Sequence, residues 1–196
     1  MTGYHLALFV HLLALIAAAV ASGLVHLSEH RFHHSGSLHE ARQWHTFAGV
    51  TSRTFPIAVL VLVGTGAYMV AGGAIWPWSA GWVRAGLAGA IVLMGTGAVI
   101  GKRSARVGRM LEERAQTGAF DAATSLPADR IIGMLSWSNT CLALAVVFDM
   151  VSKPTLVPAL GILAVGILVG LSVAAATEPK AVPAEELAAS AQGDPG

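Results

Sequence analysis

Eight histidines fall within the first 45 residues of this 196-residue chain, and none follows His45. Because residues of an α-helix advance by about 100° each, four chelating side chains near the end of the first apolar run share a sector of roughly 100°. They are His26, Glu29, His30 and His33. Imidazole nitrogens and a carboxylate are ligands for Zn, Cu, Ni and Fe. The spacing predicts a divalent transition-metal site, with a polar helix end or a pH-sensing cluster as alternatives.

His11 and His45 are candidates for a second chemistry, the axial ligation of a b-type haem. Membrane cytochromes of this kind hold the haem between ligands on different helices. His11 lies inside the first apolar run, about 22 Å along a helix axis from His26. Because the later apolar runs contain no histidine, the second ligand would be His45 or a methionine such as Met69.

The elements that carry these residues are predicted to lie in a membrane. The chain is 55% hydrophobic and 12% charged, with a mean hydropathy of +0.66, whereas soluble domains carry about 25% charged residues. The net charge of +1 gives no indication of nucleic-acid binding. A single cysteine, Cys141, excludes a disulfide framework and a cysteine-based zinc site.

Uncharged runs predict an all-α integral membrane bundle of about five transmembrane helices, since about 20 apolar residues span a bilayer. The predicted helices are about 4–34, 54–73, 83–101, 131–152 and 155–177. No Lys or Arg precedes the first run, which favours a spanning helix over a cleaved signal peptide. Residues 1–177 form the transmembrane domain, and the Ala-, Glu- and Pro-rich tail 178–196 is predicted to be a disordered cytoplasmic segment.

Charge predicts the orientation, because Lys and Arg collect in cytoplasmic loops. Two loops on one side hold nine of the twelve basic residues: Arg31, Arg42, Arg53, Lys102, Arg103, Arg106, Arg109, Arg114 and Arg130. The N-terminus is therefore predicted outside and the C-terminus inside. Trp76, Trp78 and Trp82 mark the outer boundary, where indoles favour the headgroup region.

Local spacing predicts several contacts. Ser37 and Glu40 form a capping box for a helix after Gly36. Asp149 and Lys153 have the spacing of a helical ion pair at the rim of the bundle. Asn139 is expected to hydrogen-bond across helices.

Two glycine pairs are expected to let helices approach closely in lipid. They are Gly97 with Gly101 and Gly166 with Gly170.

The segment LFVHLLAL at residues 8–15, which contains His11, resembles small bacterial integral membrane proteins of unknown function. The residues WH at 44–45 and RTFP at 53–56 fit the same group. The opening segment is also distantly similar to the membrane domain of copper-resistance D-type proteins. That resemblance spans roughly residues 4–175 and implies metal or haem handling at His11.

These observations predict a non-enzymatic, multi-pass protein of the bacterial inner membrane that binds a transition metal at the inner end of its first helix. A b-haem or quinone-linked redox component is the first alternative. An accessory subunit of a membrane complex is the second. The bilayer is the expected partner, together with a second copy or a membrane-complex partner.

Overall fold

A computed structural model describes residues 3–72, 76–117 and 129–177, and the predicted tail 178–196 lies outside them. The described residues form six α-helices and no strand. The helices are α1 Gly3–His33, α2 Leu38–Ser52, α3 Thr54–Gly72, α4 Gly81–Thr117, α5 Arg130–Ser152 and α6 Leu156–Thr177. Five segments are long and apolar enough to cross a membrane, with α2 and α3 counted as one. The all-α prediction is confirmed, as is the expectation of five candidate spans.

Two helical segments extend well beyond the predicted spans. The helix predicted at 83–101 continues to Thr117, because the Arg- and Glu-containing sequence after Gly101 favours helix and contains no proline. The segment before the second predicted span forms α2. Its N-cap is Ser37, whose side chain accepts from the Glu40 amide at 3.2 Å, while the Glu40 carboxylate accepts from the Gly36 amide. The predicted cap is confirmed.

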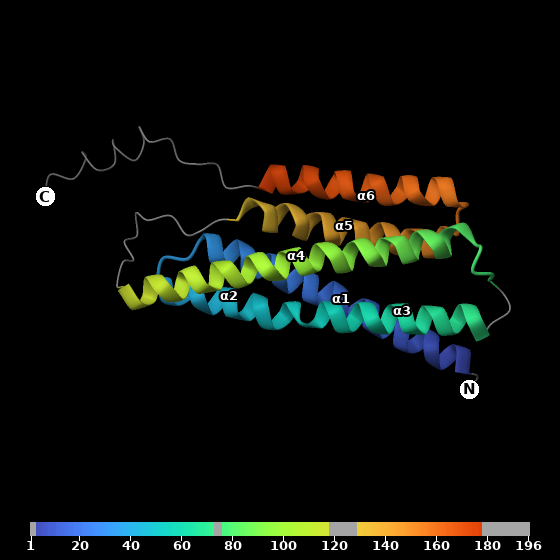
Figure 1. The fold of residues 1–196 in the computed structure, drawn as a ribbon, viewed down its shortest axis with the longest axis horizontal. Helices are drawn as coiled ribbons and strands as arrows, with labels where there is room; N and C mark the ends of the chain where they lie inside the picture. The colour runs from blue at the N-terminus through green and yellow to red at the C-terminus, as the bar shows by residue number, and fades with distance from the viewer. Residues whose placement is uncertain (1–2, 73–75, 118–128, 178–196) are drawn as a thin grey trace, which may run out of the picture.

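The helices form two groups that run side by side (Figure 1). In one group α1 packs against α3, and in the other α5 packs between α4 and α6. The long α4 links the groups, since its second half contacts α2. In contrast, α1 and α5 meet over a short stretch, and that stretch is polar.

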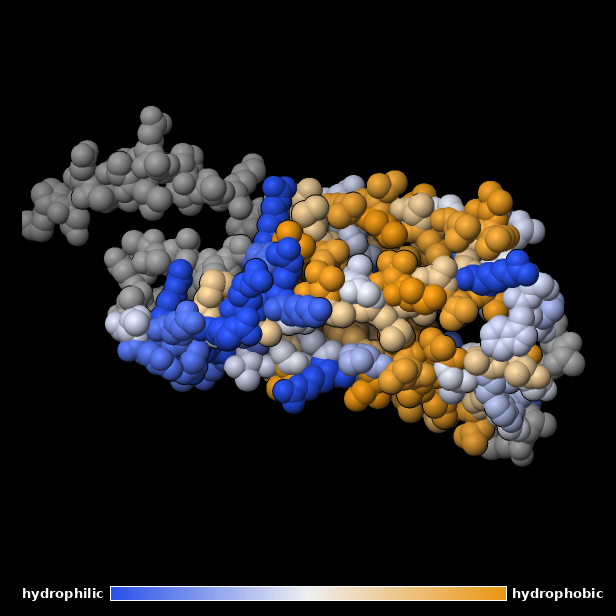
Figure 2. Space-filling view, viewed as in Figure 1, coloured by the Kyte–Doolittle hydropathy of each residue, from blue (hydrophilic) through white to orange (hydrophobic). Residues whose placement is uncertain are grey.

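The surface of the bundle is divided by polarity (Figure 2). Large apolar side chains such as Phe9, Leu60 and Val157 are more than half exposed, which in a soluble protein would be an aggregation liability. Hydrophilic residues gather toward the end where α1 finishes, α2 begins and α5 begins. We call this the basic end, because the nine basic residues named above lie toward it.

Small residues pack α5 against α6. A Cβ atom at Gly166 would lie 2.9 Å from Ala145 Cβ and 3.0 Å from the Cys141 carbonyl oxygen. One at Gly170 would lie 2.7 Å from both the Ser138 amide nitrogen and the Trp137 carbonyl oxygen. This pair of glycines is therefore a packing surface, as predicted.

The other predicted glycine pair is not used in this way. A Cβ atom at Gly97 or Gly101 would meet nothing within 4 Å. The prediction of close packing at this pair is therefore wrong for the contacts within the chain. The two glycine pairs have the same spacing in the sequence. They differ in whether a neighbouring helix packs against them.

The opposite end, which we call the tryptophan end, joins α4 to the turn between α5 and α6. The rings of Trp76 and Trp82 meet edge to face at 5.8 Å. The Lys153 ammonium lies 4.2 Å from the centre of the Trp76 ring. The predicted ion pair between Asp149 and Lys153 is wrong, because Lys153 adopts a left-handed backbone conformation (φ 53°) and its side chain is directed to the indole.

Candidate functional site

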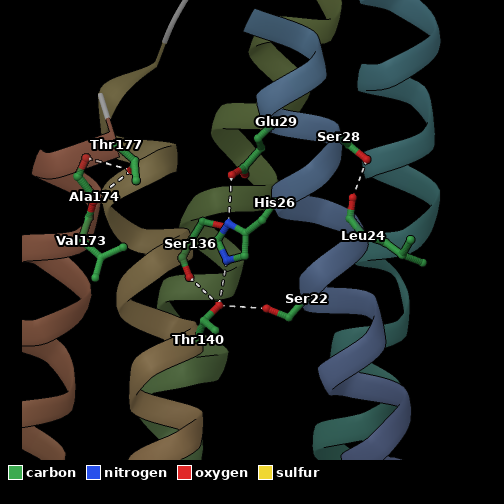
Figure 3. Close-up of polar contacts among 10 residues, drawn as sticks. All are labelled: Ser22, Leu24, His26, Ser28, Glu29, Ser136, Thr140, Val173, Ala174 and Thr177. Atoms are coloured by element: carbon green, nitrogen blue, oxygen red, sulfur yellow. Dashed lines mark hydrogen bonds and ion pairs between the residues drawn. The ribbon is translucent and has the colours of Figure 1, made fainter. Parts of the chain in front are cut away.

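His26 is the centre of a polar cluster between α1 and α5 (Figure 3). Its Nε2 atom lies 2.9 Å from Thr140 Oγ1, and its Nδ1 atom lies 3.5 Å from Glu29 Oε2. The imidazole also stacks on the Trp137 indole, with ring centres 4.0 Å apart and planes 20° apart. Ser22 completes the cluster through a 2.8 Å hydrogen bond to Thr140.

Helix geometry brings these residues together. Ser22, His26 and Glu29 follow one another at spacings of four and three residues, which places them on one face of α1. Trp137 and Thr140 are three residues apart on α5. The cluster therefore joins the two helix groups at the place where α1 crosses α5.

The hydrogen bonds of Thr140 indicate where the protons lie. A threonine hydroxyl has one donor and two acceptor lone pairs. Thr140 donates to the Ser136 carbonyl at 3.1 Å, so its lone pairs are left for Ser22 and His26. In this arrangement the Ser22 hydroxyl and the His26 Nε2–H both donate to Thr140.

That assignment makes Nδ1 the nitrogen of His26 that gains or loses a proton. In the neutral ring with hydrogen on Nε2, the Nδ1 lone pair faces the Glu29 carboxylate, and two acceptors oppose each other. A proton on Nδ1 converts this contact into an ion pair and a hydrogen bond. The stacked indole of Trp137 also favours a cationic ring over a neutral one.

Partial burial strengthens these interactions without removing access to protons. The side chains of His26 and Glu29 are 14% and 24% exposed. Ion pairs shielded in this way are screened less by salt than surface pairs. Glu29 lies on the side of His26 that is closer to the basic end.

The predicted metal ligands are not gathered in the structure. His26 and Glu29 remain adjacent, but His30 and His33 are exposed and turned away. The His30 ring packs against His34 at 4.3 Å. Within the described residues, no three His, Cys, Asp or Glu side chains are arranged to hold a metal ion. Side chains that share a 100° sector of one helix diverge from one another, so they need a further ligand from a facing helix. Among the residues that the structure describes, no facing helix contributes one.

His11 and His45 are also held apart. His11 Nδ1 lies 2.9 Å from Thr65 Oγ1, between α1 and α3. The His45 ring lies 6.1 Å from Phe32 near the other end of α1, which is roughly 30 Å from His11 along the helix. The pair therefore does not fit a single haem. Each imidazole instead lies at a contact between two helices: His11 between α1 and α3, and His45 between α1 and α2.

A second polar contact joins α4 to α5 through Asn139, whose interhelical hydrogen bond was predicted without its partner. The Thr96 hydroxyl of α4 donates to Asn139 Oδ1 at 2.6 Å, so the expected interhelical bond of Asn139 is confirmed. The roles of Thr140 and Trp137 as partners of His26 were not predicted. The available signal was the polar run SWSNT at 136–140, which places hydroxyl, amide and indole groups on one turn of an apolar helix.

No family model, curated protein or solved structure matches this chain. The resemblance to small bacterial membrane proteins and to copper-resistance D-type domains stays a prediction. The geometry of the cluster is what any functional assignment must rest on.

Proposed function

We propose that this chain is a non-enzymatic, multi-pass protein of the bacterial inner membrane that responds to cytoplasmic pH by binding a proton on His26. The observation that supports this most is the position of Nδ1. It faces the Glu29 carboxylate at 3.5 Å, and it belongs to the cluster that joins α1 to α5.

The proposed orientation puts the N-terminus outside and the C-terminus in the cytoplasm. Positive charge near spanning segments favours the cytoplasmic side, and the basic end carries nine of the twelve Lys and Arg residues. Arg84 and Lys153 belong to the tryptophan end. His26 and Glu29 are then reached from the cytoplasm.

Reporter fusions test this orientation. A fusion after Arg114 is expected to behave as cytoplasmic, and one after Ser79 as external, because α4 separates them across the bilayer. Paired alkaline phosphatase and fluorescent-protein fusions measure this directly. The reversed pattern would show that the N-terminus is cytoplasmic. Cytoplasmic signals from both fusions would show that α4 does not cross the membrane.

Proton binding changes how the two helix groups are joined. With Nδ1 protonated, the imidazolium attracts both Glu29 and the Trp137 ring while Nε2–H holds Thr140. With Nδ1 deprotonated, the attraction to Glu29 becomes repulsion between acceptors. Because α1 and α5 meet over a short stretch, this one ring has a large influence on their contact.

Tryptophan fluorescence tests the proton site, because a protonated imidazole in contact with an indole quenches its emission. We expect emission to fall as the pH is lowered, because proton binding at His26 brings a cationic ring against the indole. The quenching is expected to be lost in His26→Gln and in Trp137→Phe. Glu29→Gln is expected to weaken the quenching, since an amide does not form an ion pair with the imidazolium.

His30→Gln is the matched control, because His30 is an exposed histidine one turn further along α1. It is expected to titrate like the parent protein. Quenching of equal size in the parent and in His26→Gln would contradict the proposal.

A transition-metal site is the competing proposal, and the adjacent nitrogen and oxygen ligands of His26 and Glu29 favour it. Calorimetry with Zn²⁺ separates the two readings. The proton site requires equal zinc uptake by the parent protein and by a variant with His26 and His30 both replaced by alanine. Uptake of about one ion per chain that the double variant loses would favour the metal.

A further inference from the structure

Asp149 is a carboxylate with no partner inside the bundle. Its exposed fraction is 0%, and neither of its carboxylate oxygens has a hydrogen-bond partner among the described residues. It lies on α5 one turn before the helix ends at Ser152. Ionisable side chains within a membrane are rare and are functional candidates by default.

The charged groups of the neighbouring helices do not neutralise it. Lys153, on the same helix, bonds Asp149 only through the backbone, where its amide donates to the Asp149 main-chain carbonyl at 2.8 Å. Its ammonium lies over Trp76. Arg84 on α4 is exposed, and α6 contains no titratable residue.

A second unpartnered polar atom lies at the same end of the bundle. The indole Nε1–H of Trp82 is buried and has no hydrogen-bond acceptor within the part of the chain that the structure describes. One turn further along α4, a Cβ atom at Gly86 would lie 3.7 Å from Met150 Cε and 4.0 Å from Val146 Cγ1. Since those residues flank Asp149 on α5, the donor of Trp82 and the carboxylate of Asp149 lie at the same end of the α4–α5 contact, about one helical turn apart.

The surroundings of Asp149 are apolar. Ala85, Leu142, Ala145, Ala159 and Leu163 form the adjacent core, with Val146 packed against it. A lone carboxylate anion in such surroundings is strongly disfavoured. A metal cation would need several oxygen ligands, whereas a proton needs only one oxygen.

We propose that Asp149 is a proton-binding site in the outer half of the membrane, separate from His26. One carboxylate oxygen takes a proton from the external side and becomes a neutral acid. Thr140 and Asp149 are nine residues apart on α5, about 13 Å along the axis, so the inference does not rest on the cluster at His26.

Labelling with dicyclohexylcarbodiimide tests the proposal, because this apolar reagent reacts with protonated carboxyl groups in lipid-like surroundings. The full chain in liposomes is treated over a range of pH, and peptide mass spectrometry locates the adduct. We expect labelling at Asp149, decreasing at least tenfold as the pH rises to strongly alkaline values. Asp149→Asn is expected to lose this adduct. Glu112 and Asp129, which pair with Arg42 and Arg103, are expected to stay unlabelled.

Three further measurements keep the result decisive. An infrared band of a protonated carboxylic acid is expected in the parent protein and absent from Asp149→Asn; if that variant does not fold, the pH dependence of the parent band serves alone. Lys153→Met is expected to label like the parent, and increased labelling would reveal a hidden ion pair and overturn the proposal. Replacing choline chloride by sodium chloride at constant pH is expected to have no effect. Protection by sodium would assign the site to a metal cation, and absence of labelling at every pH would exclude a protonated acid.

Discussion

Gly170→Leu is expected to destabilise the bundle more than any other single change considered. A Cβ atom at this position would lie 2.7 Å from both the Ser138 amide nitrogen and the Trp137 carbonyl oxygen. These are backbone atoms of α5, so a change of rotamer cannot relieve the clash, and α6 must move away. We expect a loss of about 3 kcal/mol in the free energy of unfolding, measured by thermal or denaturant unfolding in detergent.

Gly161→Leu is the matched control for this change. Gly161 lies on the same helix, and a Cβ atom there would meet nothing within 4 Å. The added side chain is expected to face lipid and to change stability by less than about 0.5 kcal/mol. Equal loss in both variants would mean that α6 does not pack on α5 through Gly170. Because Trp137 lies on the affected turn, Gly170→Leu is also expected to weaken the pH-dependent quenching at His26.

Leu111→Ala is expected to have the second-largest effect, at the basic end. Leu111 is 1% exposed and forms a small core with Phe32, Ala41 and Val107. Removing its side chain leaves a cavity that joins α1, α2 and the extension of α4. We expect a loss of about 2 kcal/mol, the low end for a buried leucine, together with faster amide hydrogen exchange in α2 measured by mass spectrometry.

The same substitution at an exposed position provides the comparison. Leu27 on α1 is 47% exposed, and Leu27→Ala is expected to leave exchange in α2 unchanged. The ion pair between Arg42 and Glu112 is not expected to compensate, since both side chains are largely exposed and such pairs contribute little. Unchanged exchange in Leu111→Ala would show that the extension of α4 is not packed against α2.

The sequence alone determined the all-α class and the five candidate spans. Each apolar run is long enough to span a bilayer, and in lipid an isolated helix satisfies its own backbone hydrogen bonds. A local signal was also sufficient for the cap at Ser37 and Glu40, whose partners are close in the chain. Hydropathy failed at the ends of spans, because it measures transfer into lipid, whereas α4 continues to Thr117 by helix propensity and packing.

Only the tertiary structure decided which side chains meet. The direction of His26 depends on Thr140, which is 114 residues away, and no spacing along the chain encodes that contact. The two GxxxG pairs look alike in sequence, yet only Gly166 and Gly170 face a neighbouring backbone. Asp149 and Lys153 have ideal helical spacing, but the left-handed turn at Lys153 ends the helix and directs the ammonium to Trp76. The physical reason is common to all three: helix periodicity fixes the face a residue occupies, and the packing of helices fixes what that face meets.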